Sequence, residues 1–316
     1  MVAYDARRPR RGKTEMKDLL EHVRGGEILL GDGAWGTMLM ARGLKPGECP
    51  ENVNLTQPEA LQEIAALYLE AGAEFITTNT FGGSPLKLAD YSLEDRTEEI
   101  NSRAVKALRP TIGDRALISA SVGPTGKLLL PHGDTAPETM YDSFVRQTGA
   151  LIEAGADMIC IETMIDLKEA QLAIRAARSF SADIPIMATM TFDATPNGFF
   201  TIMGTPIEQA VTGLEEAGAD IVGSNCGNGI EKMVEIGGEF RRHSRLPIAI
   251  QSNAGLPENR SGKVVYPETP AFMADHARQL IDLGVSVIGG CCGTGPDHIR
   301  ALRGLIDAHR RGLPGG

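Results

Sequence analysis

The sequence predicts an α/β protein built as a single barrel of eight parallel strands, each followed by a helix, the (β/α)8 or TIM-barrel architecture. Three observations support this: an internal repeat, a second set of apolar segments interleaved with it, and amphipathic segments in the gaps. At 316 residues, 42% hydrophobic and 23% charged, composition allows one large α/β domain or two smaller ones. The repeat therefore has to decide the architecture.

The repeat consists of a helix end, a glycine and a buried apolar strand. It occurs at residues 69–76, 152–159 and 215–222, which share the sequence Glu-Ala-Gly-Ala, and a looser copy lies at 281–288. Glycine directly after the last helical residue is a common helix terminator. The sequence therefore predicts four helix–strand units of the same kind.

A second set of apolar segments lies between the repeats, at residues 28–30, 116–120, 185–191 and 247–251. Two of them begin with proline, which a strand tolerates as its first residue. Together the two sets predict eight strands that start near residues 28, 75, 116, 158, 185, 221, 247 and 286. Their nearly continuous apolar character favours parallel pairing. An open doubly wound sheet is the alternative, although no Gly-x-Gly-x-x-Gly follows the first strand.

The gaps between strands carry amphipathic patterns typical of helices. In the segment from about residue 58 to 71, Leu61, Ile64 and Tyr68 recur at helical spacing and predict one buried face. Thr56 and Glu59 predict a capping box at its start. Eight strands and the helices between them therefore account for most of the chain.

The two ends of the chain differ from the barrel in composition. We expect residues 1–14, rich in arginine, to be a disordered basic tail, residues 15–309 to be the barrel, and residues 310–316 to be a frayed end. The alternative for residues 1–14 is a basic arm that binds nucleic acid. The net charge of −10 on the whole chain argues against binding to a phosphate backbone. Because no long apolar run or signal peptide is present, we expect a cytoplasmic protein without membrane or nucleic-acid partners.

Polar residues follow most of the predicted strands. In such a barrel the chemistry lies at the carboxyl ends of the strands. These ends comprise residues 31–37, 77–82, 121–124, 160–163, 223–227, 251–255 and 291–292. Stability alone does not require so many polar groups at one rim, so the sequence predicts a functional site there.

The eighth strand ends in two adjacent cysteines, Cys291 and Cys292. A disulfide between them is disfavoured, because consecutive α-carbons lie about 3.8 Å apart and an unstrained bridge needs about 4.4–6.8 Å. Gly289, Gly290 and Gly293 allow the strand to break, so that both thiols reach one ion. Two buried structural cysteines are an equal alternative for this pair taken alone.

A third thiol, Cys226, ends the sixth predicted strand and faces the same mouth. Three thiolates suit zinc, and three protein ligands leave a position open for water or substrate. Five cysteines without an export signal also fit reduced thiols. We expect Cys160 to be a core residue, Cys49 to belong to a loop, and His243 and His298 to be surface residues rather than ligands.

The chain resembles the homocysteine S-methyltransferase family from about residue 25 to 305. The segments that carry the resemblance are Gly31-Asp32-Gly33-Ala34, Thr78-Asn79-Thr80-Phe81, the strand with Glu162, Asn225-Cys226-Gly227, Ser252-Asn253-Ala254-Gly255, Val265-Tyr266-Pro267 and Gly289-Gly290-Cys291-Cys292-Gly293-Thr294. Within that family it is most similar to the homocysteine-binding barrel of cobalamin-dependent methionine synthase. The resemblance implies Zn²⁺ held by Cys226, Cys291 and Cys292, and homocysteine as the methyl acceptor.

The residue chemistry agrees with that implication. Homocysteine needs a carboxylate for its ammonium group, a role that fits Glu162, and N–H donors for its carboxylate, a role that fits the backbone of Asp32, Gly33 and Ala34. The resemblance implies that Asp32 and Asn225 line the same pocket. The alternatives are that Glu162 is paired with a lysine or arginine at the barrel mouth and that Asp32-Gly33 is only a turn.

The methyl donor remains open. Zinc coordination would remove the proton of the acceptor thiol and so provide the nucleophile for attack on an activated methyl group. Because the sequence stops after one barrel, we expect the donor in trans, as methylcobalamin on a separate corrinoid protein. A small donor such as S-methylmethionine or betaine is the alternative, and other small thiols are alternative acceptors.

Two hypotheses compete with a methyltransferase. One is a non-catalytic barrel that binds zinc or homocysteine, and the weaker one is a redox role of the three thiols.

Overall fold

The computed structural model describes residues 16–260 and 263–312, and eight parallel strands form its central sheet. They are β1 (Leu29–Leu30), β2 (Phe75–Thr77), β3 (Leu117–Val122), β4 (Met158–Met164), β5 (Ile186–Met190), β8 (Ile221–Asn225), β9 (Ile248–Ser252) and β12 (Val287–Gly290). Their order is β1–β12–β9–β8–β5–β4–β3–β2, and the N–H of Glu74 donates to the carbonyl of Leu30 (2.7 Å) where β2 meets β1. The strands therefore form a nearly closed barrel, and the prediction of a (β/α)8 fold is confirmed.

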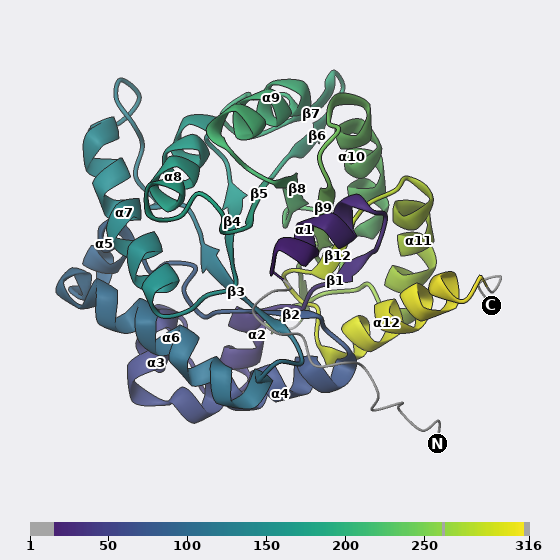
Figure 1. Ribbon diagram of the computed structural model, residues 1–316, viewed down its shortest axis with the longest axis horizontal. Helices are drawn as coiled ribbons and strands as arrows, with labels where there is room; N and C mark the ends of the chain where they lie inside the picture. Colours follow the sequence, from purple (N-terminus) through teal and green to yellow (C-terminus); the bar gives the residue numbers. More distant parts are fainter. Residues whose placement is uncertain (1–15, 261–262, 313–316) are drawn as a thin grey trace.

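Helices surround the strands as a ring, and α1 (Met16–Arg24) lies over one end of the barrel (Figure 1). The other helices are α2 (Trp35–Met40), α3 (Val53–Thr56), α4 (Pro58–Ala71), α5 (Pro85–Leu88), α6 (Thr97–Ile112), α7 (Pro137–Glu153), α8 (Leu167–Phe180), α9 (Ile207–Ala217), α10 (Ile230–His243), α11 (Pro270–Asp282) and α12 (Pro296–Arg310). Short 3₁₀ turns lie at Pro50–Asn52, Ala89–Tyr91 and Glu94–Arg96. The predicted tail 1–14 lies outside the described residues, and α12 continues through Arg310 at the start of the predicted C-terminal end.

Two hairpins that the sequence analysis did not predict extend the loops after the fifth and seventh barrel strands. The first consists of β6 (Asp193–Thr195) and β7 (Gly198–Phe200), and the second of β10 (Glu258–Arg260) and β11 (Lys263–Val265). Both follow the carboxyl end of a barrel strand. They therefore enlarge the rim on which the polar residues were predicted.

The repeat corresponds to one helix terminator used four times. The glycines Gly72, Gly155, Gly218 and Gly284 all have φ between 72° and 106°, a backbone region that favours glycine. In each copy the residue after the glycine donates its N–H to a carbonyl in the last helical turn, for example Ala73 to Tyr68 (3.1 Å). This is the pattern of a Schellman motif. The glycine thus ends the helix and directs the chain into the next strand, as predicted.

An acidic residue two positions after the glycine joins neighbouring strands. The carboxylate of Asp220 accepts from the N–H of Ile186 (2.9 Å) and from Arg178 (2.6 Å). Asp157 does the same with Ile118 and Arg109, and Glu74 accepts from the N–H of Leu30. Three of the four copies of the repeat therefore supply a hydrogen-bonded ion pair at the start of a barrel strand, that is, at every second strand from β2 to β8.

The start of α4 departs from the prediction. The helix begins at Pro58 as expected, but its N-cap is Gln57, which makes no side-chain capping bond. The hydroxyl of Thr56 instead donates to the carbonyl of Asn52 (3.0 Å), because Thr56 is the last residue of α3. The predicted capping box of Thr56 and Glu59 is wrong, since a short preceding helix occupies the residue that would have been the cap.

The inside of the barrel changes from apolar to polar along the strands. Leu29, Phe75, Met158, Met187, Ile221, Ala249 and Val287 form one buried cluster with Leu19 and Val23 of α1. Helix α1 therefore covers the amino-terminal end of the barrel, as Figure 1 shows. Two residues further along the strands, on the same face, lie Thr77, Cys160, Thr189, Gln251 and Gly289. The apolar end is closed, and polar groups begin towards the carboxyl ends.

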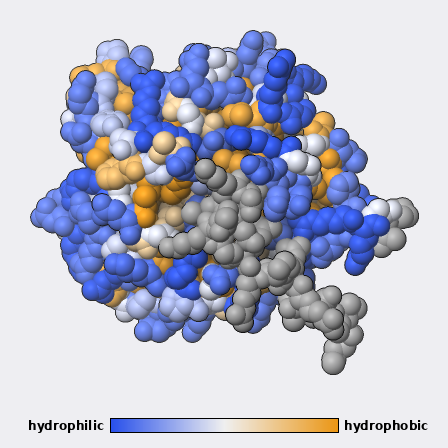
Figure 2. Space-filling view, viewed as in Figure 1, coloured by the Kyte–Doolittle hydropathy of each residue, from blue (hydrophilic) through white to orange (hydrophobic). Residues whose placement is uncertain are grey.

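Figure 2 shows the face that carries α1, where hydrophilic residues predominate and hydrophobic residues appear in patches between them. No helix within residues 16–260 and 263–312 combines the length and the apolar character that crossing a bilayer requires.

Replacing Asp220 by alanine should lower the free energy of unfolding by about 2–4 kcal/mol, because a buried N–H and a nearly buried arginine lose their shared partner. The side chain of Arg178 is only 20% exposed. Asp220→Asn keeps an acceptor oxygen, so its free energy of unfolding should fall by less than that of Asp220→Ala. Denaturant unfolding followed by circular dichroism measures both. The control is Glu63→Ala, whose side chain is 67% exposed; a loss as large as that of Asp220→Ala would contradict the assignment.

Candidate metal centre and active site

The chain turns sharply at the end of β12, where the two adjacent cysteines lie. The strand ends at Gly290, and the N–H of Thr294 donates back to the carbonyl of Cys291 (3.1 Å). Gly293 has φ of 81°, and a β-carbon there would lie 2.1 Å from the ring of Tyr266. Glycine is therefore required at this position, and the break in the strand allows both thiols to lie on one side.

Cys226 follows β8 directly, in the left-handed backbone region (φ 61°). Such a φ is uncommon for a residue other than glycine and costs about 1–3 kcal/mol. Its N–H donates to the carbonyl of Gln251 on β9 (3.1 Å), and the N–H of Cys291 donates to the carbonyl of Ser252 (2.7 Å). Strand β9 lies between β8 and β12, so it holds both turns at the same height.

The three sulfur atoms of Cys226, Cys291 and Cys292 lie within 4.8 Å of one another. The Sγ atoms of Cys226 and Cys292 are 3.7 Å apart. Tetrahedral Zn–S bonds of about 2.3 Å place two sulfurs about 3.8 Å apart, so the cluster has the spacing of a thiolate zinc site. The prediction that these thiols converge at the barrel mouth is confirmed.

Hydrogen bonds among the three thiols shift their pKa values in opposite directions. Hydrogen bonds from Cys291 and Cys292 hold the pKa of Cys226 well below its usual range. Hydrogen bonding to Cys226 holds the pKa values of the other two above theirs. Two thiols thus stabilise one thiolate, and a divalent cation would be needed to deprotonate all three.

Two residues of the surrounding shell contact these sulfurs. The side chain of Asn253 hydrogen-bonds Cys226, and that of Tyr266 hydrogen-bonds Cys292. Burial, followed by the charge on Cys292, raises the pKa of Tyr266 to about 12. The Oδ1 atom of Asn253 is buried and has no hydrogen-bond partner among the described residues. Amide oxygen and nitrogen are interchangeable by a side-chain flip, so this group can also present an oxygen to the cluster.

Glu162 lies on β4 at the same mouth. Ser121 donates a short hydrogen bond to its Oε1, and Oε2 lies 3.4 Å from the Nδ2 of Asn225. Burial raises the pKa of Glu162 to about 7, with smaller contributions from the charges of Asp32 and Cys226. Within the described residues Glu162 forms no ion pair with lysine or arginine, so a cation supplied by a ligand would be its natural partner.

The side chain of Asp32 is 1% exposed, and both of its carboxylate oxygens accept hydrogen bonds from other residues. It accepts from the indole of Trp35 (2.9 Å) and from the N–H and hydroxyl of Thr77 (2.8 and 2.7 Å). Burial outweighs these bonds and raises its pKa to about 6. The carboxylate therefore connects the loop after β1 to the end of β2.

The two residues after Asp32 lie beside the turn that carries the cysteines. The N–H of Ala34 donates to the carbonyl of Thr294 (3.2 Å), and a β-carbon on Gly33 would lie 2.8 Å from the Thr294 hydroxyl. The N–H of Gly33 has no acceptor among the described residues. The N–H of Asp32 is directed at the carboxylate of the same residue. Of the predicted carboxylate donors, Gly33 is thus the one that the described residues leave available.

Asn225 is fully buried between strands. Its Oδ1 accepts from the N–H of Thr163 (2.7 Å) and the hydroxyl of Thr189 (2.8 Å). Its Nδ2 donates to the Thr163 hydroxyl (2.7 Å) and lies 3.8 Å from the Sγ of Cys291. The amide therefore contacts both the segment that holds Glu162 and the thiol cluster.

The remaining cysteines and histidines lie away from the cluster. Cys160 is a buried residue of β4 and Cys49 is a buried residue before the first 3₁₀ turn, hydrogen-bonded to Glu51. His298 is half-buried rather than on the surface, and its ring nitrogens contact the backbone of Gly295 and Glu268. His243 pairs with a glutamate of its own helix.

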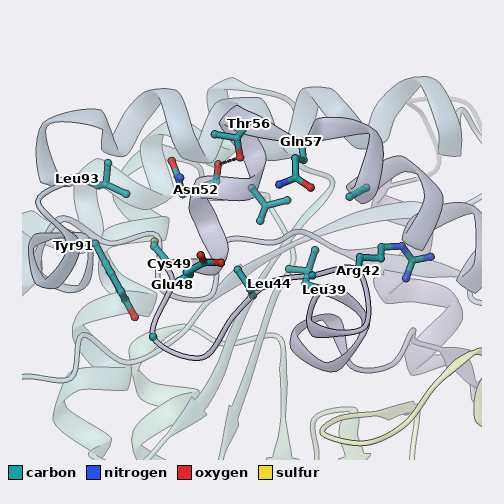
Figure 3. A pocket seen from close by; sticks show the side chains of 14 residues that line it. Leu39, Arg42, Leu44, Glu48, Cys49, Asn52, Thr56, Gln57, Tyr91 and Leu93 are labelled. Carbon is teal, nitrogen blue, oxygen red and sulfur yellow. Dashed lines mark hydrogen bonds between the residues drawn. The ribbon is translucent and has the colours of Figure 1, made fainter.

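Sequence reasoning left Ser121, Thr163, Asn253 and Tyr266 out of the site. Each follows or ends a barrel strand or stands in a segment that carried the family resemblance, so rim position was the available signal. A separate recess of about 550 Å³ lies between the loops after β1 and β2 (Figure 3). Several of its polar side chains already have protein partners, Arg42 with Glu63 for instance, so we do not assign it to the site.

Fold and site together define a (β/α)8 barrel with a cluster of three thiols at its mouth. The chain belongs to the homocysteine S-methyltransferase family, because the model of that family matches residues 29–306. It is 33% identical over 308 residues to a protein named methionine synthase from Mycobacterium tuberculosis and 32% identical to the one from Mycobacterium leprae. These matches cover 92% of this chain but 25% of each relative, so the chain spans about a quarter of their length.

Solved structures agree on the fold. The homocysteine methyltransferase MmuM from Escherichia coli superimposes in its metallated form with a TM-score of 0.72 at 24% identity, covering 88% of this chain and 96% of that one. Its oxidized form gives the same TM-score at 25% identity. The carboxyl transferase domain of Rhizobium etli pyruvate carboxylase (TM-score 0.52, 14% identity, 93% of this chain and 50% of that one) shares only the barrel.

Glu162→Gln should change how stability depends on pH in the metal-free protein. Between pH 4.5 and about 7 the folded carboxyl keeps a proton that the unfolded chain releases, so the wild type loses stability as pH rises through this range. Glutamine removes that loss, and the variant should gain about 1–2 kcal/mol relative to wild type between pH 5 and pH 8, allowing for partial solvent screening. Urea unfolding at both pH values measures this, with Glu208→Gln, an exposed residue of α9, controlling for net charge. If wild type and Glu162→Gln differed in free energy of unfolding by the same amount at pH 5 and at pH 8, the raised pKa of Glu162 would be contradicted.

Proposed function

We propose that the protein is a zinc-dependent homocysteine S-methyltransferase that forms methionine. The observation that supports this best is the convergence of Cys226, Cys291 and Cys292 within 4.8 Å at the mouth of a barrel of this family. Three thiolates suit zinc and leave one coordination position for a fourth ligand. The reduced thiols that such a site needs fit a cytoplasmic location.

The bound zinc would supply a Lewis acid that keeps the acceptor thiol deprotonated at neutral pH. Cys226, Cys291 and Cys292 would hold it, and their combined negative charge leaves the acceptor sulfur nucleophilic. The buried amide oxygen of Asn253 is the candidate for the remaining position before the acceptor binds. Tyr266 donates to the sulfur of Cys292 and so orients it.

The amino-acid end of homocysteine would bind beside the cluster. We assign its ammonium group to Glu162, because a cation would favour the charged form of a carboxyl whose pKa burial has raised to about 7. We assign its carboxylate to the loop of Asp32, Gly33 and Ala34, chiefly to the N–H of Gly33. Asp32 itself would act by holding this loop against Thr77. The bound thiol then lies with its sulfur towards the cysteines.

For the donor we propose a methyl-corrinoid protein that binds over the barrel mouth. The loops after the strand ends expose seven large hydrophobic side chains, each 39% to 74% accessible: Phe81, Leu128, Leu130, Ile202, Met203, Leu256 and Val264. Such an accumulation on one face is typical of an interaction surface. The relatives named methionine synthase are about four times as long as the matched region, which leaves room in them for donor-binding modules.

Cys226→Ala should lose bound zinc and methionine formation together, because two cysteines cannot hold the ion against dialysis. Metal analysis after dialysis in reducing buffer and an assay for methionine measure the two losses. The matched control is Cys49→Ala, which removes a buried cysteine away from the cluster. This variant should keep the zinc bound by the three cluster cysteines. Retention of full zinc in Cys226→Ala would contradict the site.

X-ray absorption distinguishes the enzyme from a non-catalytic barrel. A fourth sulfur should join the zinc when homocysteine is added to the wild type. A zinc environment that homocysteine does not alter would support a structural metal instead.

Ile202→Ser and Leu256→Ser should raise KM for a methylated corrinoid protein about tenfold each, because each removes apolar contact area worth about 1–2 kcal/mol. KM for homocysteine should not change. Leu67→Ser, a 36% exposed leucine of α4, is the control. Turnover with S-methylmethionine or betaine in the absence of any corrinoid would overturn the proposed donor and leave the acceptor chemistry intact.

A further inference from the structure

Two non-glycine residues with left-handed backbone stand on the two strands that flank β5. Of the described residues other than glycine, Ser92, Thr163 and Cys226 have positive φ; Thr163 lies in β4 and Cys226 directly follows β8. Thr163 is β-branched and its φ is 60°, a conformation that such residues adopt only when the surroundings impose it. It lies in a register shift of β4 between Ile161 and Met164. The interactions that hold this turn therefore also set the direction of Glu162.

The side chain of Asn225 is what holds the turn. It accepts from the N–H of Thr163 and donates to the hydroxyl of the same residue, both at 2.7 Å. A second lone pair of its Oδ1 accepts from Thr189 (2.8 Å), and the remaining Nδ2 hydrogen faces Glu162 and Cys291 at 3.4 and 3.8 Å. Because an amide has two donors and two acceptor positions, these contacts use its full capacity.

This result changes the role expected for Asn225. A residue that lines the pocket to bind substrate needs a free donor or acceptor, and Asn225 has none left. Instead, one nitrogen lies within 4 Å of both a carboxylate oxygen of Glu162 and the sulfur of Cys291. The same residue precedes Cys226 in the chain, so its side chain and its backbone connect the two halves of the site.

We propose that Asn225 is a positioning residue that fixes the separation between the Glu162 carboxylate and the thiol cluster, and thereby selects acceptors with an ammonium group three carbons from the sulfur. The proposal rests on the proposed function, since it assigns the ammonium group to Glu162. It differs from a merely structural role in one respect. Loss of Asn225 should weaken binding of homocysteine much more than binding of the same thiol acid without the amino group.

The test compares homocysteine with γ-mercaptobutyrate by calorimetric titration of the zinc-loaded protein. Asn225→Ala should raise Kd for homocysteine about 10- to 100-fold, the range expected when a charged hydrogen bond is lost, and Kd for γ-mercaptobutyrate less than threefold. Thr163→Val removes the hydroxyl that accepts from the Nδ2 of Asn225. It should raise the ratio of Kd for homocysteine to Kd for γ-mercaptobutyrate, but by less than Asn225→Ala does. Thr189→Val, which touches Asn225 but not the turn, is the control and should leave the ratio within twofold. A parallel rise for both thiols, or an unchanged ratio in Thr163→Val, would overturn the proposal.

A second readout needs no thiol ligand. Amide hydrogen exchange at Thr163 should be at least tenfold faster in Asn225→Ala than in wild type, and unchanged in Thr189→Val. If Asn225→Ala does not fold, Thr163→Val and Asn225→Asp, which keeps an acceptor but loses the donor, decide the question in the titration. Wild-type protein that binds neither thiol would refute the proposed function, whereas unchanged exchange at Thr163 in a folded Asn225→Ala would refute the role of Asn225.

Discussion

The site depends on two backbone hydrogen bonds from β9. The carbonyls of Gln251 and Ser252 accept from the N–H groups of Cys226 and Cys291, which follow the strands on either side. Parallel pairing places the carboxyl ends of neighbouring strands side by side, so residues far apart in the chain emerge at one height. Zinc-type spacing of the sulfurs is therefore a consequence of strand register, and side-chain flexibility contributes little to it.

The barrel separates stability from chemistry along its axis. One end is filled by apolar side chains and covered by α1, and the repeated carboxylates of Glu74, Asp157 and Asp220 join the strand starts. The other end holds buried carboxyl groups and left-handed residues, which cost free energy. Strain at Cys226 and Thr163 is sustainable because the strands that carry them are anchored at the opposite end.

The sequence was sufficient for the architecture because the repeat encodes it locally: Gly72 and its three equivalents each need only their own helix end. It was sufficient to place the three cysteines together, because all three follow the carboxyl ends of strands in one barrel. The prediction of a capping box at Thr56 was wrong because Thr56 is the last residue of the short helix α3. No pattern in the local sequence indicates that this helix forms. Asn253 and Thr163 were missed because their roles arise from contacts between strands, which residue type does not reveal.

The two substrates of the proposed reaction meet different kinds of surface. In the proposed reaction the acceptor would face buried groups whose hydrogen bonds are nearly all satisfied within the protein, so a thiol of the wrong length would leave a carboxylate such as Glu162 without its cation at considerable cost. The donor would face exposed apolar side chains such as Ile202 and Leu256 on loops, which adapt to a partner without disturbing the strands. Acceptor choice would then be tied to the fold itself, whereas donor choice could change by substitution in the loops. The proposed arrangement would therefore allow one thiol site to work with different methyl donors.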